Sequence, residues 1–152
     1  MTVQPVNRTI LQGGSHEQCQ IHGNRFADPG HPYNPRPRSR EKEFVAAIGS
    51  DGIQHVEILG GSYFFDPNYI VVKANTPVEL KVRKESGMVP HDFVLKAPEA
   101  GMDIKVDLKT EPTVVRFTPT KAGKYPIYCS KKPPFLESHR EKGMEGVLEV
   151  RE

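Results

Sequence analysis

Three observations predict an all-β protein, a Greek-key β-sandwich or barrel. From position 41 onward, short runs of β-branched and aromatic residues recur at roughly the 8 to 12 residue spacing of all-β sandwiches. Several runs alternate apolar and polar residues, as do residues 78–83, and this alternation is typical of a strand with one buried face. Gly, Pro, Asn and Asp separate the runs, and 14 prolines in 152 residues argue against a helical bundle.

The expected elements follow from these runs in chain order. The candidate strands are residues 43–48, 53–59, 69–73, 78–83, 92–95, 103–108, 113–118, 124–129 and 147–151. One short helix is expected over residues 133–142, because proline suits a first helical turn and Gly143 can end a helix in a left-handed conformation. Eight or nine strands with one late helix favour Greek-key topology.

Residues 1–40 differ from the rest of the chain. Residues 26–40 contain four prolines among polar residues, a pattern that favours extended conformations and excludes both a helix and a central strand. The chain length is that of one ordinary domain with an appendage. We therefore expect a proline-rich N-terminal arm over residues 1–40 and one domain over residues 41–152.

Charge and hydropathy exclude several classes of protein. The 21 basic and 19 acidic residues give a net charge of +2, too balanced for the basic footprint of a nucleic-acid binder. The longest uninterrupted apolar run is residues 44–48, so we expect neither a membrane span nor the apolar region of a secretory signal. Two cysteines, Cys19 and Cys129, permit one disulfide at most, which excludes a disulfide-stapled scaffold.

Metal-ligating residue types gather at the ends of the expected strands. Cys129 ends one strand and is followed by His139 and Met144 before the last strand, and His91 lies at the start of another. Two His and one Cys with a weak axial Met form the donor set of copper electron-transfer sites, because sulfur suits Cu(I) and imidazole suits both oxidation states. Alternatives remain open: Cys129 can be a buried core thiol, and Met88 is a rival soft donor.

With these motifs the chain resembles the cupredoxin family over roughly residues 50–152. The matching features, in chain order, are Pro90-His91, the run from Phe117 to Tyr125, Tyr128-Cys129, His139, Gly143-Met144 and Gly146. The resemblance implies the Greek-key fold of that family and one copper ion. It further implies that His91, Cys129 and His139 are the strong ligands and Met144 the axial ligand.

The sequence departs from the family at two positions of interest. Nine residues separate Cys129 from His139, whereas simple blue copper proteins have a much shorter loop, and no second Cys is present in it, which favours a mononuclear site. Asp92 follows the first His where the family commonly has Asn. Its carboxylate can tie the two ligand segments together by accepting hydrogen bonds, and it adds negative charge beside the metal.

The resemblance implies a one-electron carrier and not an enzyme, because no open coordination position is expected. It implies a c-type cytochrome or a terminal oxidase or reductase as partner and the bacterial periplasm as location, with the signal sequence already removed. One alternative is a copper-handling chaperone or sensor, in which His16, Cys19 and His22 acquire the metal. The others are a small enzyme or an accessory copper domain of an oxidase, in which the long loop leaves the copper open to a ligand, and a metal-free β-sandwich.

Several residues have two interpretations. His16, Cys19 and His22 can be incidental residues of a polar docking segment, and a disulfide between Cys19 and Cys129 would abolish the copper site. Phe135 and Leu136 can either cap the site against water or present an apolar docking patch. The remaining aromatic residues fall mostly in strand patterns and are expected in the core; they are Tyr63, Phe64, Phe65, Tyr69, Phe93, Phe117, Tyr125 and Tyr128.

Overall fold

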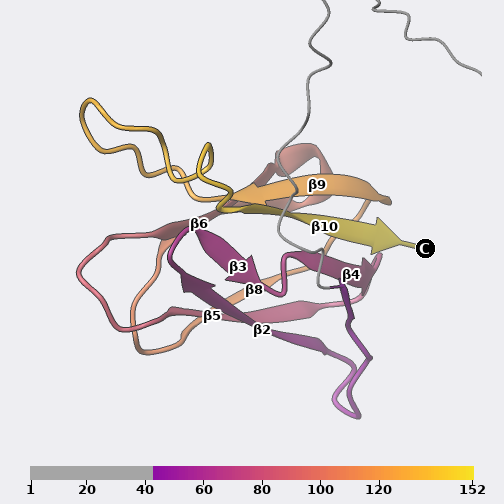
Figure 1. Cartoon of the computed structure of the whole chain (residues 1–152). Helices are drawn as coiled ribbons and strands as arrows, with labels where there is room; N and C mark the ends of the chain where they lie inside the picture. The colour runs from indigo at the N-terminus through magenta and orange to yellow at the C-terminus, as the bar shows by residue number, and fades with distance from the viewer. Residues whose placement is uncertain (1–42) are drawn as a thin grey trace, which may run out of the picture. The chain divides into compact units, whose positions relative to one another are not determined.

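A computed structural model describes residues 43–152 as two β-sheets (Figure 1). One sheet has six strands in the order β1-β4-β10-β9-β6-β7, and the other has four in the order β3-β2-β5-β8. The strands are β1 (Glu43–Val45), β2 (Gln54–Gly61), β3 (Phe64–Asp66), β4 (Tyr69–Lys73), β5 (Val78–Lys84), β6 (Asp92–Ala97), β7 (Met102–Asp107), β8 (Thr113–Phe117), β9 (Gly123–Tyr128) and β10 (Glu145–Arg151). The predicted all-β sandwich is thus confirmed.

The inward-facing side chains of both sheets form one core. Alternate residues of β2 and β5, such as Val56 and Leu80, are almost fully buried, as the alternation in the sequence predicts. Phe65 and Phe93 meet edge to face with ring centroids 5.7 Å apart, which joins the two sheets. Each such side chain contributes about 1.5–3 kcal/mol by leaving water.

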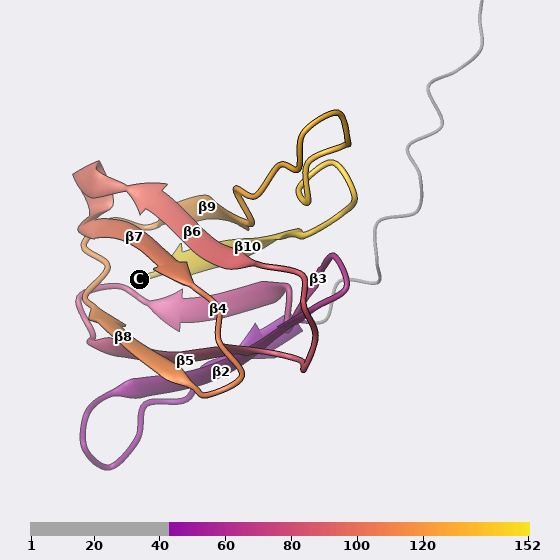
Figure 2. The ribbon, with the colours of Figure 1, turned by 90° about the vertical axis from the view of Figure 1, so that its left-hand side faces the viewer.

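The strand pairing brings three separated segments to one end of the sheets. In the antiparallel pair β9·β10, Tyr128 faces Glu145, so the residues that follow β9 and precede β10 are neighbours. Strand β6 pairs with both β9 and β7, and the segment that enters β6 therefore reaches the same end. Figure 2 shows the loops 84–91 and 129–144 leaving the sheets on this side.

The predicted strands agree with the observed ones except near the N-terminus of the domain. Strand β1 is shorter than expected, and beyond it Ile48 forms only an isolated bridge with Gln54. Strand β3 was not expected, because its three residues follow a Gly-Gly pair that resembles a turn. In the structure that pair belongs to β2, and Gly60 and Gly61 pair with Phe65 and Phe64.

The expected helix over residues 133–142 is wrong. The segment belongs to a long loop between β9 and β10, with separate turns, one of them closed by the Leu136 N–H donating to the Pro133 oxygen at 3.3 Å. Phe135 has a φ of 63°, a left-handed conformation that ends any helical path begun at Pro134. Among residues 43–152 the helical element is a single 3-10 turn, η1 (Pro98–Ala100). The described residues contain no helix long and apolar enough to cross a membrane.

Candidate metal centre

The three residues expected to be strong ligands meet at one end of the sheets. Cys129 directly follows β9, His91 directly precedes β6, and His139 lies in the loop that leads to β10. Their donor atoms all lie within 4.8 Å of one another. Within residues 43–152 this is the one group of His, Cys, Asp or Glu side chains placed to hold a metal ion.

The donor atoms are spaced as ligands of a single ion. The Nδ1 atoms of His91 and His139 are 3.1 Å apart, and His139 Nδ1 lies 3.5 Å from Cys129 Sγ. Metal bonds of about 2.0 Å to nitrogen and 2.3 Å to sulfur place neighbouring ligand atoms roughly 3.3 to 3.7 Å apart. Two of the three donor pairs are therefore close to the spacing of ligands on one ion, and the whole group lies within 4.8 Å. A thiolate with two imidazoles fits copper.

All three side chains are buried, and burial controls their protonation. Cys129, His139 and His91 are 0%, 1% and 5% exposed. Burial raises the pKa of the Cys129 thiol, and it lowers the pKa of His139, an effect to which Lys142 adds. Burial, together with the neighbouring His139, lowers the pKa of His91 to about 4. At neutral pH both imidazoles are therefore neutral ligands, and metal binding has to displace the thiol proton.

Backbone hydrogen bonds hold the ligand segments together. The Cys129 N–H donates to the oxygen of Met144 at 3.0 Å, and the Met144 N–H donates to the oxygen of His139 at 2.9 Å. The Leu108 N–H donates to the oxygen of His91, also at 2.9 Å. Main-chain contacts thus hold the backbone of all three donor residues.

Met144, the expected axial ligand, is fully buried beside this group. Its methyl carbon lies 3.3 Å from the position that a Cβ on Gly60 would occupy, and Leu108 Cδ1 lies 2.6 Å from the same point. A glycine at position 60 of β2 therefore leaves space for the side chains of Leu108 and Met144. The backbone of Met144 is bonded to two of the three donor residues, Cys129 and His139.

Asp92 ties the first ligand segment to the second, as expected from its position after His91. Its buried carboxylate accepts hydrogen bonds from Ser130 N at 2.6 Å and Ser130 Oγ at 2.5 Å, and its own N–H donates to Cys129 Sγ at 3.4 Å. Burial opposes ionisation of this carboxyl, but the Ser130 hydrogen bonds outweigh burial, and the pKa of Asp92 lies below its ordinary value. The side chain is therefore a fixed negative charge next to the thiol.

Tyr63 packs against the core, as expected, and it is in addition a site residue that the sequence did not reveal. Its ring stands nearly perpendicular to both imidazoles, with centroids 5.0 Å from His139 and 6.2 Å from His91.

The interpretation of Phe135 as a cap is wrong, because that side chain is fully exposed. Leu136 is 58% exposed, so the docking interpretation of this pair stays open.

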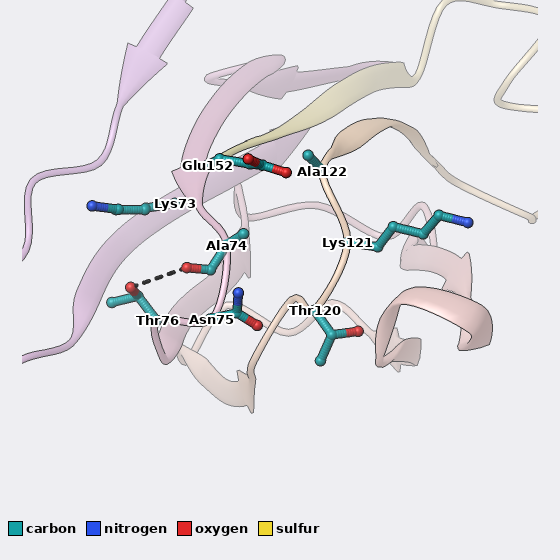
Figure 3. A pocket seen from close by; sticks show the side chains of 8 residues that line it. All are labelled: Lys73, Ala74, Asn75, Thr76, Thr120, Lys121, Ala122 and Glu152. Carbon is teal, nitrogen blue, oxygen red and sulfur yellow. Dashed lines mark hydrogen bonds between the residues drawn. The ribbon is translucent and has the colours of Figure 1, made fainter.

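The other candidate features are not part of the described group. The predicted arm over residues 1–40 falls outside residues 43–152, and with it His16, Cys19 and His22. The possible Cys19–Cys129 disulfide therefore involves a residue outside the described part of the chain; Cys129 itself is a free thiol. A polar hollow of about 600 Å³ lies at the far end of β9 from Cys129 (Figure 3). Its lining offers lysines, hydroxyls, an amide and a carboxylate, with neither His nor Cys; the side chains are Lys73, Ala74, Asn75, Thr76, Thr120, Lys121, Ala122 and Glu152.

Comparison with known proteins agrees with this fold. The family profile of the cupredoxin-like domain matches residues 42–143, and the chain therefore belongs to the cupredoxin-like family. No curated protein matches the chain. The expectation of a copper cofactor is confirmed at this level, because the family assignment and the His, Cys, His group agree.

Solved structures share the fold at low sequence identity. The metal-binding domain of the Cu(I)-exporting P-type ATPase of Streptococcus pneumoniae, solved with Cu(I), aligns with a TM-score of 0.57 and 19% identity over 75% of this chain and 100% of that one. A copper-binding protein in its apo form aligns with a TM-score of 0.53 and 21% identity over 73% of this chain and 99% of that one. Reduced auracyanin from the photosynthetic bacterium Roseiflexus castenholzii aligns with a TM-score of 0.53 and 18% identity over 70% of this chain and 99% of that one.

Proposed function

We propose that this protein is a mononuclear copper protein that carries single electrons between redox partners. The observation that supports the proposal most directly is the buried group of His91, Cys129 and His139, whose donor atoms lie within 4.8 Å of one another. A preassembled set of two imidazoles and one thiolate is typical of copper electron-transfer centres. Bound copper would supply the one-electron chemistry.

In the proposed centre His91, Cys129 and His139 are the strong ligands and Met144 is the axial ligand. The backbone hydrogen bonds that join Met144 to Cys129 and to His139 support this assignment, because they keep the three residues next to one another. The same bonds restrict movement of the ligands when the oxidation state changes. A site that moves little on reduction is suited to electron transfer.

Residues around the ligands complete the proposed centre. The Asp92 N–H directed at Cys129 Sγ stabilises negative charge on sulfur, and hydrogen bonds of this kind influence the reduction potential of a metal. Burial of the three donors excludes water. Four protein donors in a water-excluding site leave no position for a substrate, so the proposal does not include an enzymatic activity.

The proposed partners are redox proteins such as a c-type cytochrome or a terminal oxidase or reductase, and the proposed location is the bacterial periplasm. The fold shared with auracyanin, described in its reduced form, is compatible with a redox role.

The fold shared with a Cu(I)-bound domain of a copper exporter favours a second candidate, a copper-handling protein that transfers the metal itself. An accessory copper domain of an oxidase is the third candidate.

The carrier and copper-handling proposals differ in whether copper stays bound. The copper-loaded full chain would be cycled between oxidised and reduced forms at an electrode, in the presence of a Cu(I) chelator. A carrier gives a reversible one-electron couple and retains one copper per chain over many cycles. Loss of copper to the chelator on reduction would contradict the carrier proposal and favour copper handling.

Cys129→Ser and Cys19→Ser form the matched pair of variants for this experiment. Cys129→Ser should abolish the couple, because serine does not supply a soft thiolate. Cys19→Ser should leave it unchanged, because Cys19 is not among the proposed ligands. A couple that depends on Cys19 would place the copper in the arm.

A further inference from the structure

Tyr63 has an unfavourable backbone conformation for its residue type. It lies between β2 and β3, and its φ of 66° falls in the left-handed region that bulky side chains rarely adopt. Its N–H donates to the oxygen of Gly61 at 2.7 Å, which closes a tight turn. Glycine or asparagine would occupy this position with less strain, so the contacts of the tyrosine ring are the place to look for its role.

The ring lies between the imidazoles and the surface. Tyr63 is itself partly exposed, whereas His139 and His91, which its ring contacts at near-perpendicular angles of 74° and 80°, are 1% and 5% exposed. Edge-to-face contacts of this kind are favourable for aromatic rings at such centroid separations. The tyrosine ring therefore covers the pair of imidazoles and contributes to their burial.

The ligand loop holds the ring from its other side. Lys142 Nζ lies 4.5 Å from the centroid of the Tyr63 ring and 3.4 Å from its hydroxyl, so it makes both a cation–π contact and a polar contact. At Gly143 a Cβ would lie 3.8 Å from the Tyr63 oxygen, so the loop also passes close to the tyrosine backbone. The turn between β2 and β3 is thus coupled to the loop that carries His139.

We propose that Tyr63 is a positioning residue that closes the metal centre: its ring, held by Lys142, covers the imidazoles of His91 and His139 and keeps external ligands and reagents away from the donor atoms. This inference deepens the proposed function, because it concerns access to the same site. Movement of the Tyr63 ring is then required before a foreign ligand can reach the metal or a reagent can reach Cys129.

The first test uses the metal-free full chain, so that it does not depend on copper. In a Cys19→Ser background, the rate at which a disulfide reagent such as dithiobis(nitrobenzoate) modifies Cys129 is measured under native conditions. Tyr63→Asn, which removes the ring while tolerating the left-handed backbone, should raise this rate on the order of tenfold or more at a temperature where the variant is still fully folded. Tyr63→Phe keeps the ring over the imidazoles and should react at nearly the rate of the parent.

Phe135→Asn is the matched control, because Phe135 is also an aromatic residue at a φ of 63° but is fully exposed. It should leave the modification rate unchanged. Lys142→Met is a second test that does not alter the turn, and it should raise the rate several-fold by releasing the ring. If the rates for Tyr63→Asn and Lys142→Met equal that of the parent, or if Phe135→Asn accelerates modification as much, Tyr63 does not close the centre.

A second test uses the copper-loaded protein and separates the two proposals. Azide should leave the electron paramagnetic resonance spectrum of the parent unchanged and should alter that of Tyr63→Asn. If copper fails to give a thiolate-bound centre, the proposed function fails, and the thiol rates still decide the role of Tyr63. If the parent and Tyr63→Asn respond equally to azide, the inference about Tyr63 fails while the copper centre stands.

Discussion

The buried imidazole of His91 should make the metal-free protein sensitive to mild acid. Its pKa is lowered from 6.5 to about 4, first by burial and then by the neighbouring His139. Between these two pH values the unfolded chain binds a proton at this residue that the folded chain does not bind. Folding stability is therefore fully present above pH 6.5 and falls as the pH is lowered towards 4.

The size of the effect follows from the difference between the two pKa values. A tenfold difference in proton affinity between the folded and unfolded chains corresponds to about 1.4 kcal/mol, so His91 alone should cost the folded state about 3 kcal/mol by pH 4. The lowered pKa of His139 acts in the same direction. A loss of this size is a large fraction of the stability of an ordinary domain, about 5 to 15 kcal/mol.

Urea denaturation at several pH values between 7.5 and 4 measures this loss. Carboxyl groups also titrate near the acid end of the range, so the informative quantity is the difference between the parent and His91→Gln, which has no titratable group at that position. The parent should lose about 3 kcal/mol more than His91→Gln. The exposed His55 outside the centre supplies the control variant His55→Gln. Equal pH dependence in the parent and His91→Gln would show that burial of His91 does not cause the acid sensitivity.

Two further predictions concern the Asp92 hydrogen bonds and the close backbone approach at Gly146. Asp92→Ala removes both acceptors of the Ser130 hydrogen bonds and should lower the free energy of unfolding, measured in urea, by about 3 kcal/mol. Asp92→Asn should lose less, because one acceptor remains. Equal stability of Asp92→Ala and the parent would contradict this prediction. In Gly146→Ala the new Cβ would lie 2.2 Å from the backbone oxygen of Asn68. Thermal unfolding should therefore show a free energy of unfolding lower by about 1–3 kcal/mol. An unchanged melting temperature would disprove the close approach.

The strands could be predicted where side chains alternate along them. The alternation from Val78 to Val82 identified β5. Residues 69–73 form β4 with the predicted bounds although they do not alternate, because their run of β-branched residues is itself typical of a strand. Strand β3 was missed because three residues are too few for a period to show. The helix predicted over residues 133–142 failed because favourable residue types near Pro133 do not determine the backbone at Phe135, which is left-handed.

The site could be predicted only in part, for a physical reason. His91, Cys129 and His139 could be predicted because together they form the donor set of a copper site and match the cupredoxin motifs, and the structure brings them together. Tyr63 contacts the imidazoles through an unusual turn, and neither its spacing nor its residue type distinguishes it from a core aromatic. Residues 43–152 also do not include His16, Cys19 and His22, whose proposed role in copper acquisition stays a prediction.

Titration of the full metal-free chain with Cu(II), followed by visible absorption and electron paramagnetic resonance, decides whether copper binds through the Cys129 thiolate together with His91 and His139. We expect an intense sulfur-to-copper band that reaches its end point at one equivalent, disappears on reduction and returns on reoxidation. The band should be absent from Cys129→Ser and present in a variant with His16, Cys19 and His22 replaced. Absence of the band from the parent, or copper binding that follows the three arm residues instead, would contradict this ligand assignment.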